Sequence, residues 1–251
     1  MTELAGHTIV VTGAARGLGR AIATDLAARG AAVVVADTLT SDGEDVAAGL
    51  VARGRTCRFV RVDLADPKSI DALAADVAQT EGQVDGLVNN AAVATGIGGK
   101  TFNDVDIATW DHVMTVNVRG TWLVTRAFAP ALERCGRGRI VNIASDTALW
   151  GAPRLLPYVA SKGAVISMTR SLARELGPKR IGVTCVAPGL LKTWSTEYVP
   201  PERHAYYEAG RAVPGPQQPE DIVGTIAFLL SPDALTLTGQ VLPVNNGFVF
   251  T

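Results

Sequence analysis

The chain has 251 residues, 47% of them hydrophobic and 19% charged, and its formal net charge is -1. This composition is sufficient for a sizeable core, and a mixed α/β chain of this length is expected to form one domain spanning 1–251. The near-neutral charge, without a basic stripe, excludes the electrostatic signature of a nucleic-acid-binding protein.

The cysteine spacing and the short apolar runs argue against a disulfide-rich, metal-binding, secreted or membrane-spanning protein. Cys57, Cys135 and Cys185 are widely spaced and form no C-x-x-C pair, so neither a disulfide framework nor a metal site is predicted. The first six residues lack the basic start of a signal peptide, and no apolar run approaches the ~20 residues of a membrane span. We therefore expect a cytoplasmic protein without a membrane partner.

The first motif is a glycine-rich turn between an expected strand and an expected helix. A β-branched run at 8–11 leads into T-G-A-A-R-G-L-G at 12–19, and helical periodicity follows through Ile22 and Leu26. Glycines let the backbone approach a ligand closely, and the N-terminus of the following helix presents unpaired N–H groups to a phosphate. A pyrophosphate would fit there; the alternative is a tight turn with no ligand.

Asp37 ends the apolar run at 31–36, which is typical of a strand buried on both faces of a parallel sheet. An acidic residue at this position can bind the adenosine ribose hydroxyls, and its charge would repel the 2′-phosphate of NADP. The position favours NAD, although Arg16 in the glycine turn could reach a 2′-phosphate. The alternative interpretations are a strand-end cap for Asp37 and a solvated turn residue for Arg16.

Asp63 and Leu64 follow the third expected strand, 57–62, at the position where an adenine could be contacted. One helix is expected before this strand at 43–53. The next begins at Asp66, because Asp66 is a good N-cap and proline follows it, and runs to about residue 81.

Three polar side chains come from segments expected to be buried. Asn89 and Asn90 end the fourth strand, and we expect them to tie neighbouring strands together or to line a ligand. Asn117 lies on the apolar face of a helix expected at about 109–134. A buried amide there either bonds the backbone or organises a site.

Ser145 follows the strand 140–144, and ligands of open α/β sheets bind outside the carboxyl ends of strands. Tyr158 and Lys162 are four residues apart in a helix expected at 157–176, so they share one helical face. A fixed ammonium favours a nearby phenolate and lowers the tyrosine pKa, so the pair could move a proton. The alternative is an ordinary Tyr and Lys on a half-exposed helix.

The segment 190–219 is rich in proline and aromatic residues and shows little regular core pattern, so it is predicted to be a lid or a surface loop. A strand at 181–186 precedes it, and a helix at 220–230 and a strand at 240–244 follow. Strands and helices thus alternate along the whole chain. This alternation predicts a single-domain α/β fold, a doubly wound parallel sheet with helices on both faces.

Taken in order, these features resemble the short-chain dehydrogenase/reductase family over essentially the whole chain. The features are T-G-x-x-x-G-x-G at 12–19, Asp63, Asn89-Asn90-Ala91, Asn117, Ser145, Tyr158-x-x-x-Lys162 and Pro188-Gly189 with Thr193. The resemblance implies a Rossmann-like fold and four catalytic residues. Tyr158 would exchange a proton with the substrate oxygen, and Ser145 would hydrogen-bond that oxygen. Lys162 would hold the nicotinamide ribose and lower the tyrosine pKa, and Asn117 would anchor a water relay to Lys162.

The resemblance also implies a nicotinamide cofactor, with NAD favoured over NADP by Asp37. The residues expected to bind it are Gly13, Arg16, Gly17, Leu18, Gly19, Asp37, Asp63, Leu64, Asn90, Ala91, Tyr158, Lys162, Pro188, Gly189, Leu191 and Thr193. Two positions depart from the family pattern: Ala92 stands where glycine is frequent, and Asn245-Asn246-Gly247 replaces Asp-Gly-Gly. Neither departure touches the catalytic residues.

The substrate is expected to lie against Ser145, the neighbourhood of Val93 and Ala94, and the lid. The aromatic and apolar side chains Trp150, Leu156, Trp194 and Tyr198 would suit a cyclic, aromatic or hydrophobic alcohol, whereas Arg154, Arg203 and Arg211 could instead bind an acid group. The leading hypothesis is an NAD-dependent dehydrogenase of a secondary alcohol or its ketone, assembled as a homotetramer. The alternatives are an NADPH-dependent ketoreductase resembling the 3-oxoacyl reductases and a non-catalytic nucleotide-binding protein.

Overall fold

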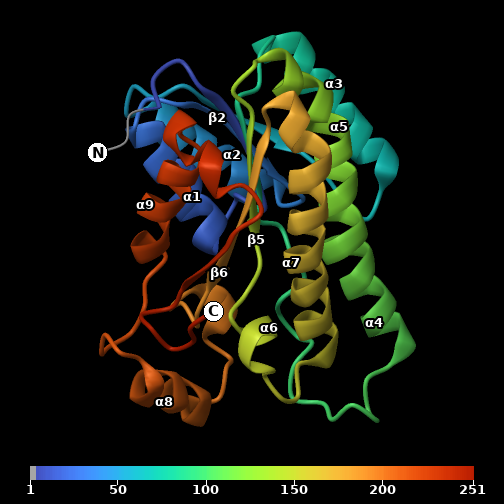
Figure 1. Ribbon diagram of the computed structural model, residues 1–251, viewed down its shortest axis with the longest axis vertical. Coiled ribbons are helices and arrows are strands. Elements are labelled where there is room, and N and C mark those ends of the chain that lie inside the picture. The colour runs from blue at the N-terminus through green and yellow to red at the C-terminus, as the bar shows by residue number, and fades with distance from the viewer. Residues whose placement is uncertain (1–3) are drawn as a thin grey trace.

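The computed structural model describes residues 4–251, which form one seven-stranded sheet with helices on both faces (Figure 1). All strand pairs are parallel, and the order is β3-β2-β1-β4-β5-β6-β7. The strands are β1 Thr8–Thr12, β2 Ala32–Asp37, β3 Cys57–Arg61, β4 Gly86–Asn89, β5 Arg139–Ile143, β6 Gly182–Pro188 and β7 Val241–Val244. The predicted fold class is confirmed.

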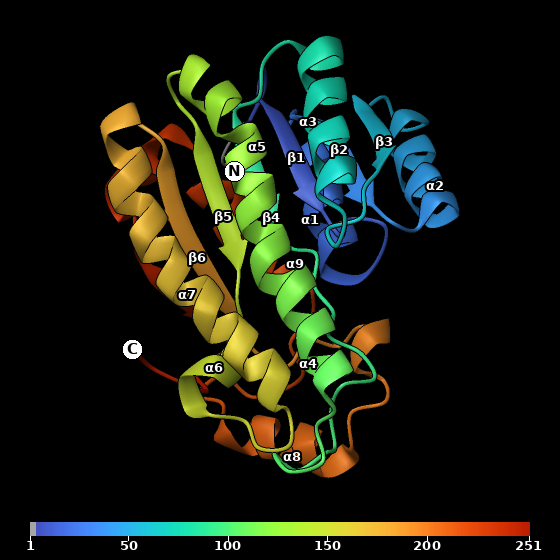
Figure 2. The same ribbon diagram turned by 90° about the vertical axis from the view of Figure 1, so that its right-hand side faces the viewer.

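The helices divide between the two faces of the sheet (Figures 1 and 2). One face is covered by α1 Gly17–Ala28, α2 Thr40–Val51 and α9 Glu220–Leu229, and the other by α3 Pro67–Glu81, α5 Thr121–Arg134 and α7 Leu156–Leu176. The remaining helices, α4 Ile107–Met114, α6 Thr147–Trp150 and α8 Pro201–Gly210, lie toward the carboxyl ends of the strands. Coverage on both faces explains why the central strands are continuous apolar runs without polar alternation.

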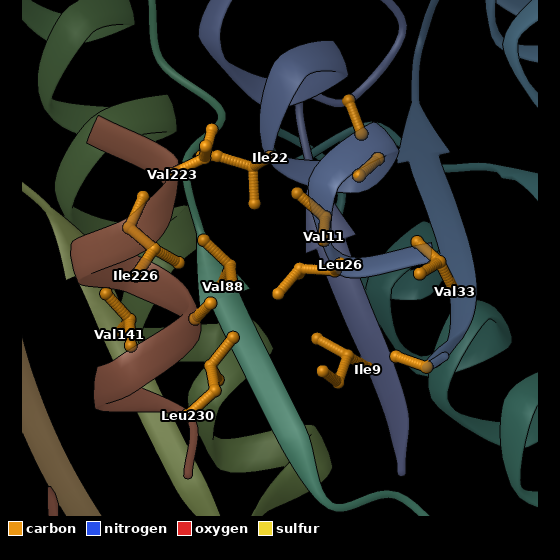
Figure 3. Close-up of a cluster of buried hydrophobic side chains, with 14 of the residues drawn as sticks. Ile9, Val11, Ile22, Leu26, Val33, Val88, Val141, Val223, Ile226 and Leu230 are labelled. Atoms are coloured by element: carbon orange, nitrogen blue, oxygen red, sulfur yellow. The ribbon is translucent and has the colours of Figure 1, made fainter. Parts of the chain in front are cut away.

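Each face has its own hydrophobic core. Figure 3 shows the first, in which Ile22 and Leu26 of α1 meet Ile226 of α9 over the sheet residues Val11 and Val88. In the second, the predicted stripe Ile70, Leu73 and Val77 of α3 packs with Phe128 and Leu132 of α5. Burial of such side chains contributes roughly 1.5–3 kcal/mol each, so the two cores hold both helical layers on the sheet.

The strand order reverses between β1 and β4, which pair directly. From β1 the chain builds outward through β2 to β3, and from β4 it builds in the opposite direction to β7. The loops leaving β1 and β4 therefore diverge to opposite sides, and a crevice forms outside their carboxyl ends.

The predicted amides tie the strands together, as expected. Asn89 Nδ2 donates to Asn142 Oδ1 at 2.8 Å and to Thr125 Oγ1 at 3.0 Å, and Asn142 Nδ2 donates to Thr169 Oγ1 at 2.9 Å. All four side chains are buried. Hydrogen bonding offsets the cost of burying these groups and links β4 and β5 to helices α5 and α7.

Several element boundaries differ from the prediction. Helix α2 begins at Thr40, before Gly43, and a π-helical stretch, Thr115–Gly120, joins α4 to α5. Helix α8 lies inside the segment expected to lack regular structure. Of the ten residues of α8, Tyr207 alone is buried, so the sequence shows no apolar stripe there. Within residues 4–251, no helix is both long and apolar enough to cross a membrane.

Candidate active site

A cavity of about 870 Å³ lies at the carboxyl ends of the strands and is lined by every residue predicted to bind the cofactor. Ser145, Trp194 and Tyr198 line the same cavity. The glycine turn, the tip of β2, the ends of β4 and β5, and the start of α7 thus meet around one space, as the topology requires. Among residues 4–251, no group of three or more His, Cys, Asp or Glu side chains could hold a metal ion.

The glycine turn is bonded to the end of β4. Asn90 Nδ2 donates to the carbonyls of Thr12 and Gly13, both at 3.0 Å, and Thr12 Oγ1 accepts from the Asn90 N–H at 3.1 Å. A Cβ at Gly13, where φ is +66°, would lie 2.7 Å from Ala91 Cα, and a Cβ at Gly19 would collide with the Gly13 carbonyl. Both positions require glycine, so the backbone itself forms this wall of the cavity.

Asp37 caps the end of β2 and also lines the cavity. Its carboxylate accepts hydrogen bonds from the Ala15 N–H at 3.0 Å and the Leu39 N–H at 3.1 Å, which joins the glycine turn to the end of β2. It also lines the cavity and is only partly buried. Arg16 is exposed, and its Cζ lies 4.0 Å from the centre of the Trp194 ring, a cation–π contact from the glycine turn to the predicted lid.

The catalytic candidates line the cavity, Ser145 from the loop after β5, and Tyr158 and Lys162 from α7. Lys162 is buried, its Nζ donates to the Ile143 carbonyl at 2.7 Å, and it lies 5.6 Å from the centre of the Tyr158 ring. Ser145 Oγ accepts hydrogen bonds from the N–H of Thr147 at 3.3 Å and from its hydroxyl at 2.9 Å. Since Thr147 donates in both bonds, the proton of the Ser145 hydroxyl can be directed to another acceptor.

The expected lowering of the tyrosine pKa is wrong for this geometry. Burial raises the pKa of Tyr158 to about 12, and the Ser145 side chain opposes that shift. Burial likewise lowers the pKa of Lys162 to about 8. The charged form of each group is disfavoured because it has left water, and this desolvation is the largest cause of both shifts.

Asn117 is buried in the π-helical stretch and does not line the cavity. Its Oδ1 accepts from the Val93 N–H at 2.7 Å, and its Nδ2 donates to the Val93 carbonyl at 3.1 Å and to Ser161 Oγ at 3.0 Å. The side chain therefore fixes the loop after β4 to helix α7, between Tyr158 and Lys162. A water relay through Asn117 stays a prediction.

Two of the residues expected to line the substrate pocket lie elsewhere. Trp150 packs among Tyr206, Tyr207 and Phe248, with ring centres 5.6, 6.1 and 5.9 Å away, and Leu156 is exposed on the first turn of α7. Neither lines the cavity, whereas Leu155 and Tyr207 do. The sequence carried no signal for Tyr207, because its burial depends on where α8 docks.

Behind Ser145 lies a buried polar network centred on Asp146. The Tyr207 hydroxyl donates to Asp146 Oδ1 at 2.7 Å and accepts from Trp150 Nε1 at 3.1 Å, and Asn245 Nδ2 donates to Asp146 Oδ2 at 3.3 Å. Burial raises the pKa of Asp146 to about 6, although the Tyr207 and Asn245 hydrogen bonds lower it. The network ties the residue after Ser145 to helix α8 and to the C-terminal segment.

Known proteins match this chain over nearly its whole length. Residues 13–249 match the family model described as enoyl-(acyl carrier protein) reductase. The chain is 36% identical over 241 residues to the subunit BbsD of a hydroxy(phenyl)methylsuccinyl-CoA dehydrogenase from Thauera aromatica, covering 95% of this chain and 94% of the relative. It is 34% identical over 260 residues to a 3-oxoacyl-(acyl-carrier-protein) reductase from Synechocystis sp., covering 99% of both.

Solved structures of dehydrogenases also match the chain in fold and sequence. A protein from Beutenbergia cavernae assigned as an NAD(P)-dependent gluconate 5-dehydrogenase, crystallised with NADP at low occupancy, superposes with a TM-score of 0.92. It is 38% identical and the match covers 98% of both chains. A dehydrogenase/reductase from Sinorhizobium meliloti is 31% identical with a TM-score of 0.91, covering 99% of this chain and 97% of that one.

Replacing Tyr207 with phenylalanine is expected to destabilise the protein by about 1–3 kcal/mol, because two buried hydrogen bonds are lost while the ring is retained. Urea unfolding measures the difference. The matched control is Tyr206→Phe, since the exposed Tyr206 shows no hydroxyl hydrogen bond within residues 4–251 and should unfold like the parent. Equal stability of the two variants would contradict a structural role for the Asp146 network.

Asp146 also predicts a pH dependence of stability. Its pKa in the folded protein, about 6, lies above the ordinary value of 3.8, so the folded state holds more protons between these values. The contribution of Asp146 to stability therefore falls as pH rises from about 4 to about 6. We expect the stability of the parent relative to Asp146→Asn to drop by on the order of 2 kcal/mol over this window, measured by urea unfolding. A pH-independent difference would be inconsistent with the raised pKa.

Proposed function

The chain belongs to the short-chain dehydrogenase/reductase family and is an oxidoreductase of alcohol and carbonyl groups. From this premise we propose that it uses NAD to interconvert a secondary alcohol and its carbonyl, with Tyr158 as the acid and base. The observation that carries the proposal is that Ser145, Tyr158 and Lys162 line the same cavity as the glycine turn. A proton-transfer pair and a dinucleotide-binding turn on one cavity are the two requirements of this chemistry.

The residues of the cavity fit a dinucleotide. The glycine turn at 13–19 offers bare backbone and the N-terminus of α1 to a pyrophosphate, since a Cβ at Gly13 or Gly19 would not be tolerated. Asp37 would hold the adenosine ribose, Asp63 and Leu64 the adenine, and Thr193 with the backbone after Pro188 the carboxamide. When bound, the nicotinamide would supply or accept the hydride.

NAD is favoured over NADP by the charge beside the expected ribose. The Asp37 carboxylate is held by two backbone N–H groups and cannot readily turn away from a 2′-phosphate, which it would repel. Arg16, the cation that could compensate, lies over the Trp194 ring. The NADP in the Beutenbergia cavernae structure is the observation that favours the alternative, an NADPH-dependent ketoreductase.

The proton steps follow from the geometry of the three side chains. Ser145 accepts from Thr147, so its own proton would be donated to the substrate oxygen. Tyr158, whose pKa is raised, would be protonated at neutral pH and ready to donate to a carbonyl oxygen. In the oxidation direction, the phenol must first release its proton. We assign that step to the buried Lys162, whose lowered pKa lies close to working pH, and to the relay at Asn117.

The segment 190–219 would act as the lid of a single catalytic domain. It contacts both walls of the cavity: Trp194 lies under Arg16, and the Tyr198 hydroxyl donates to the Ala94 carbonyl at 2.7 Å. Trp194 and Tyr198 would contribute the aromatic part of the substrate lining. The homotetramer and the cytoplasmic location stay predictions, the former to be tested by light scattering.

Replacing Tyr158 with phenylalanine should lower kcat for NAD reduction by about 10²–10⁴-fold, because the proton acceptor is lost, while dinucleotide binding survives. A screen of cyclic, aromatic, sugar and acidic alcohols identifies the substrate, and fluorescence titration with NADH measures binding. The control is Tyr206→Phe, whose ring lies outside the cavity. Near-normal turnover in Tyr158→Phe would refute the mechanism, and no turnover by the parent with any alcohol or ketone would favour the non-catalytic alternative.

Cofactor choice is tested by steady-state kinetics with both dinucleotides. We expect the parent to prefer NAD, and Asp37→Asn to shift the ratio of kcat/KM values toward NADP by tenfold or more, since the repelling charge is removed while one acceptor oxygen remains. Asp42→Asn is the matched control, because Asp42 is exposed on α2 and lies outside the cavity. A strong preference of the parent for NADPH would support the ketoreductase instead.

A further inference from the structure

We propose that the alcohol substrate carries a carboxylate group, and that Arg154 and Arg203 bind it at the lid end of the cavity. The inference rests on the proposed function and names the substrate class of the same site. The substrate is then a hydroxy acid and not the hydrophobic alcohol expected from the aromatic residues of the sequence.

Both arginines line the cavity at the end formed by the lid and the start of α7. Arg154 is four residues before Tyr158, so their Cα atoms are at most roughly 14 Å apart. Arg203 lies in the first turn of α8, and its guanidinium lies 5.4 Å from the ring centre of Trp150 in α6. One Arg203 N–H donates at 3.2 Å to the carbonyl of Pro153, the residue that precedes Arg154 in the sequence.

Neither guanidinium is neutralised by a carboxylate within residues 4–251. Arg154 shows no side-chain hydrogen bond or ion pair there, and the guanidinium of Arg203 has only the Pro153 carbonyl and the face of Trp150, 5.4 Å from the ring centre. Arg58 and Arg137, by contrast, are paired with acidic side chains. The two arginines therefore retain donors for an anion that enters the cavity.

The third arginine that could have bound an acid group does not belong to this site. Arg211 is buried, donates to the carbonyls of Gly215 and Leu190, both at 2.7 Å, and does not line the cavity. Its side chain holds the lid segment together. Of the three arginines considered for an acid group, Arg154 and Arg203 are therefore the two that line the cavity.

The backbone at Arg154 is held in an uncommon conformation. Its φ of +58° lies in the left-handed region, which costs a non-glycine residue free energy, and the Gly99 N–H fixes it by donating to its carbonyl at 2.8 Å. Strain of this kind persists where the surrounding structure enforces it and is concentrated at ligand sites. Here it presents Arg154 to the cavity.

The charge balance favours a carboxylate over a phosphate. Glu202 also lines this end of the cavity, and it forms no ion pair with either arginine within residues 4–251. Two guanidinium groups and one carboxylate leave a single net positive charge, which matches a monoanion. The planar guanidinium also matches the two oxygens of a carboxylate.

The test compares pairs of related alcohols, one with a free carboxylate and one in which that group is neutral, with NAD reduction as the readout. The pairs are 3-hydroxybutyrate with its methyl ester, mandelate with methyl mandelate, and gluconate with glucitol; glycerol 3-phosphate represents phosphates. For at least one pair we expect the acid to have a kcat/KM tenfold or more above its neutral partner. A preference for the neutral partners or for glycerol 3-phosphate overturns the inference.

Variants then assign the effect to the two arginines. Arg154→Gln and Arg203→Gln should each raise KM for the acid tenfold or more and leave kcat/KM for the neutral partner within about threefold. Arg154 is exposed, so its variant should fold as the parent does, and thermal unfolding verifies both. Arg55→Gln is the control, since Arg55 is exposed and does not line the cavity, and the substitution removes the same charge.

The outcomes separate the two proposals. If the parent oxidises no alcohol with either cofactor, the proposed function fails. If it oxidises alcohols but both arginine variants lose acid and neutral turnover equally, or neither variant changes the acid KM, the function stands and the carboxylate assignment is wrong.

Discussion

The parallel arrangement of the strands is the constraint on which the rest of this molecule depends. Every strand of a parallel sheet ends at the same edge, so the residue that follows each strand is delivered to one place. In this chain the glycine turn follows β1, Asp37 ends β2, Asn90 follows β4 and Ser145 lies just beyond β5. The reversal of strand order between β1 and β4 opens the crevice that these residues line.

Close packing at that edge depends on buried and half-buried polar groups that hydrogen-bond to their neighbours. Asn90 binds the glycine turn, Asn117 binds the loop after β4 and Ser161, and Asp146 binds Tyr207 and Asn245. Each of these side chains would be costly to bury alone, and together they fix loops that carry no regular secondary structure. The same burial raises the pKa of Tyr158 and lowers that of Lys162, so the rigidity of the site and its proton affinities have one cause.

The sheet, its helical layers and most of the cavity lining could be predicted because their signals are local. Continuous apolar runs mark buried strands, the 3.6-residue stripe Ile70, Leu73 and Val77 marks a core face, and Asp66 before a proline marks a helix start. Helix α8 and the position of Trp150 could not be predicted in this way. Helix α8 has a single buried side chain, Tyr207, so its sequence shows no apolar stripe. The position of Trp150 is determined by aromatic rings that α6, α8 and the C-terminal segment bring together.

The sequence by itself determined the alternation of the seven strands with the helices that cover the sheet, the family, and the residues that meet at the carboxyl edge. Each follows from residue types at short, fixed spacings. The tertiary structure alone decided how those residues interact. The docking of α8 decided that Trp150 hydrogen-bonds to Tyr207 instead of lining the cavity. It also decided that Arg203 lines the cavity together with Arg154, whereas Arg211 donates to backbone carbonyls of the lid. Burial decided the direction of the tyrosine pKa, since the cost of moving a phenolate out of water depends on surroundings contributed by distant parts of the chain.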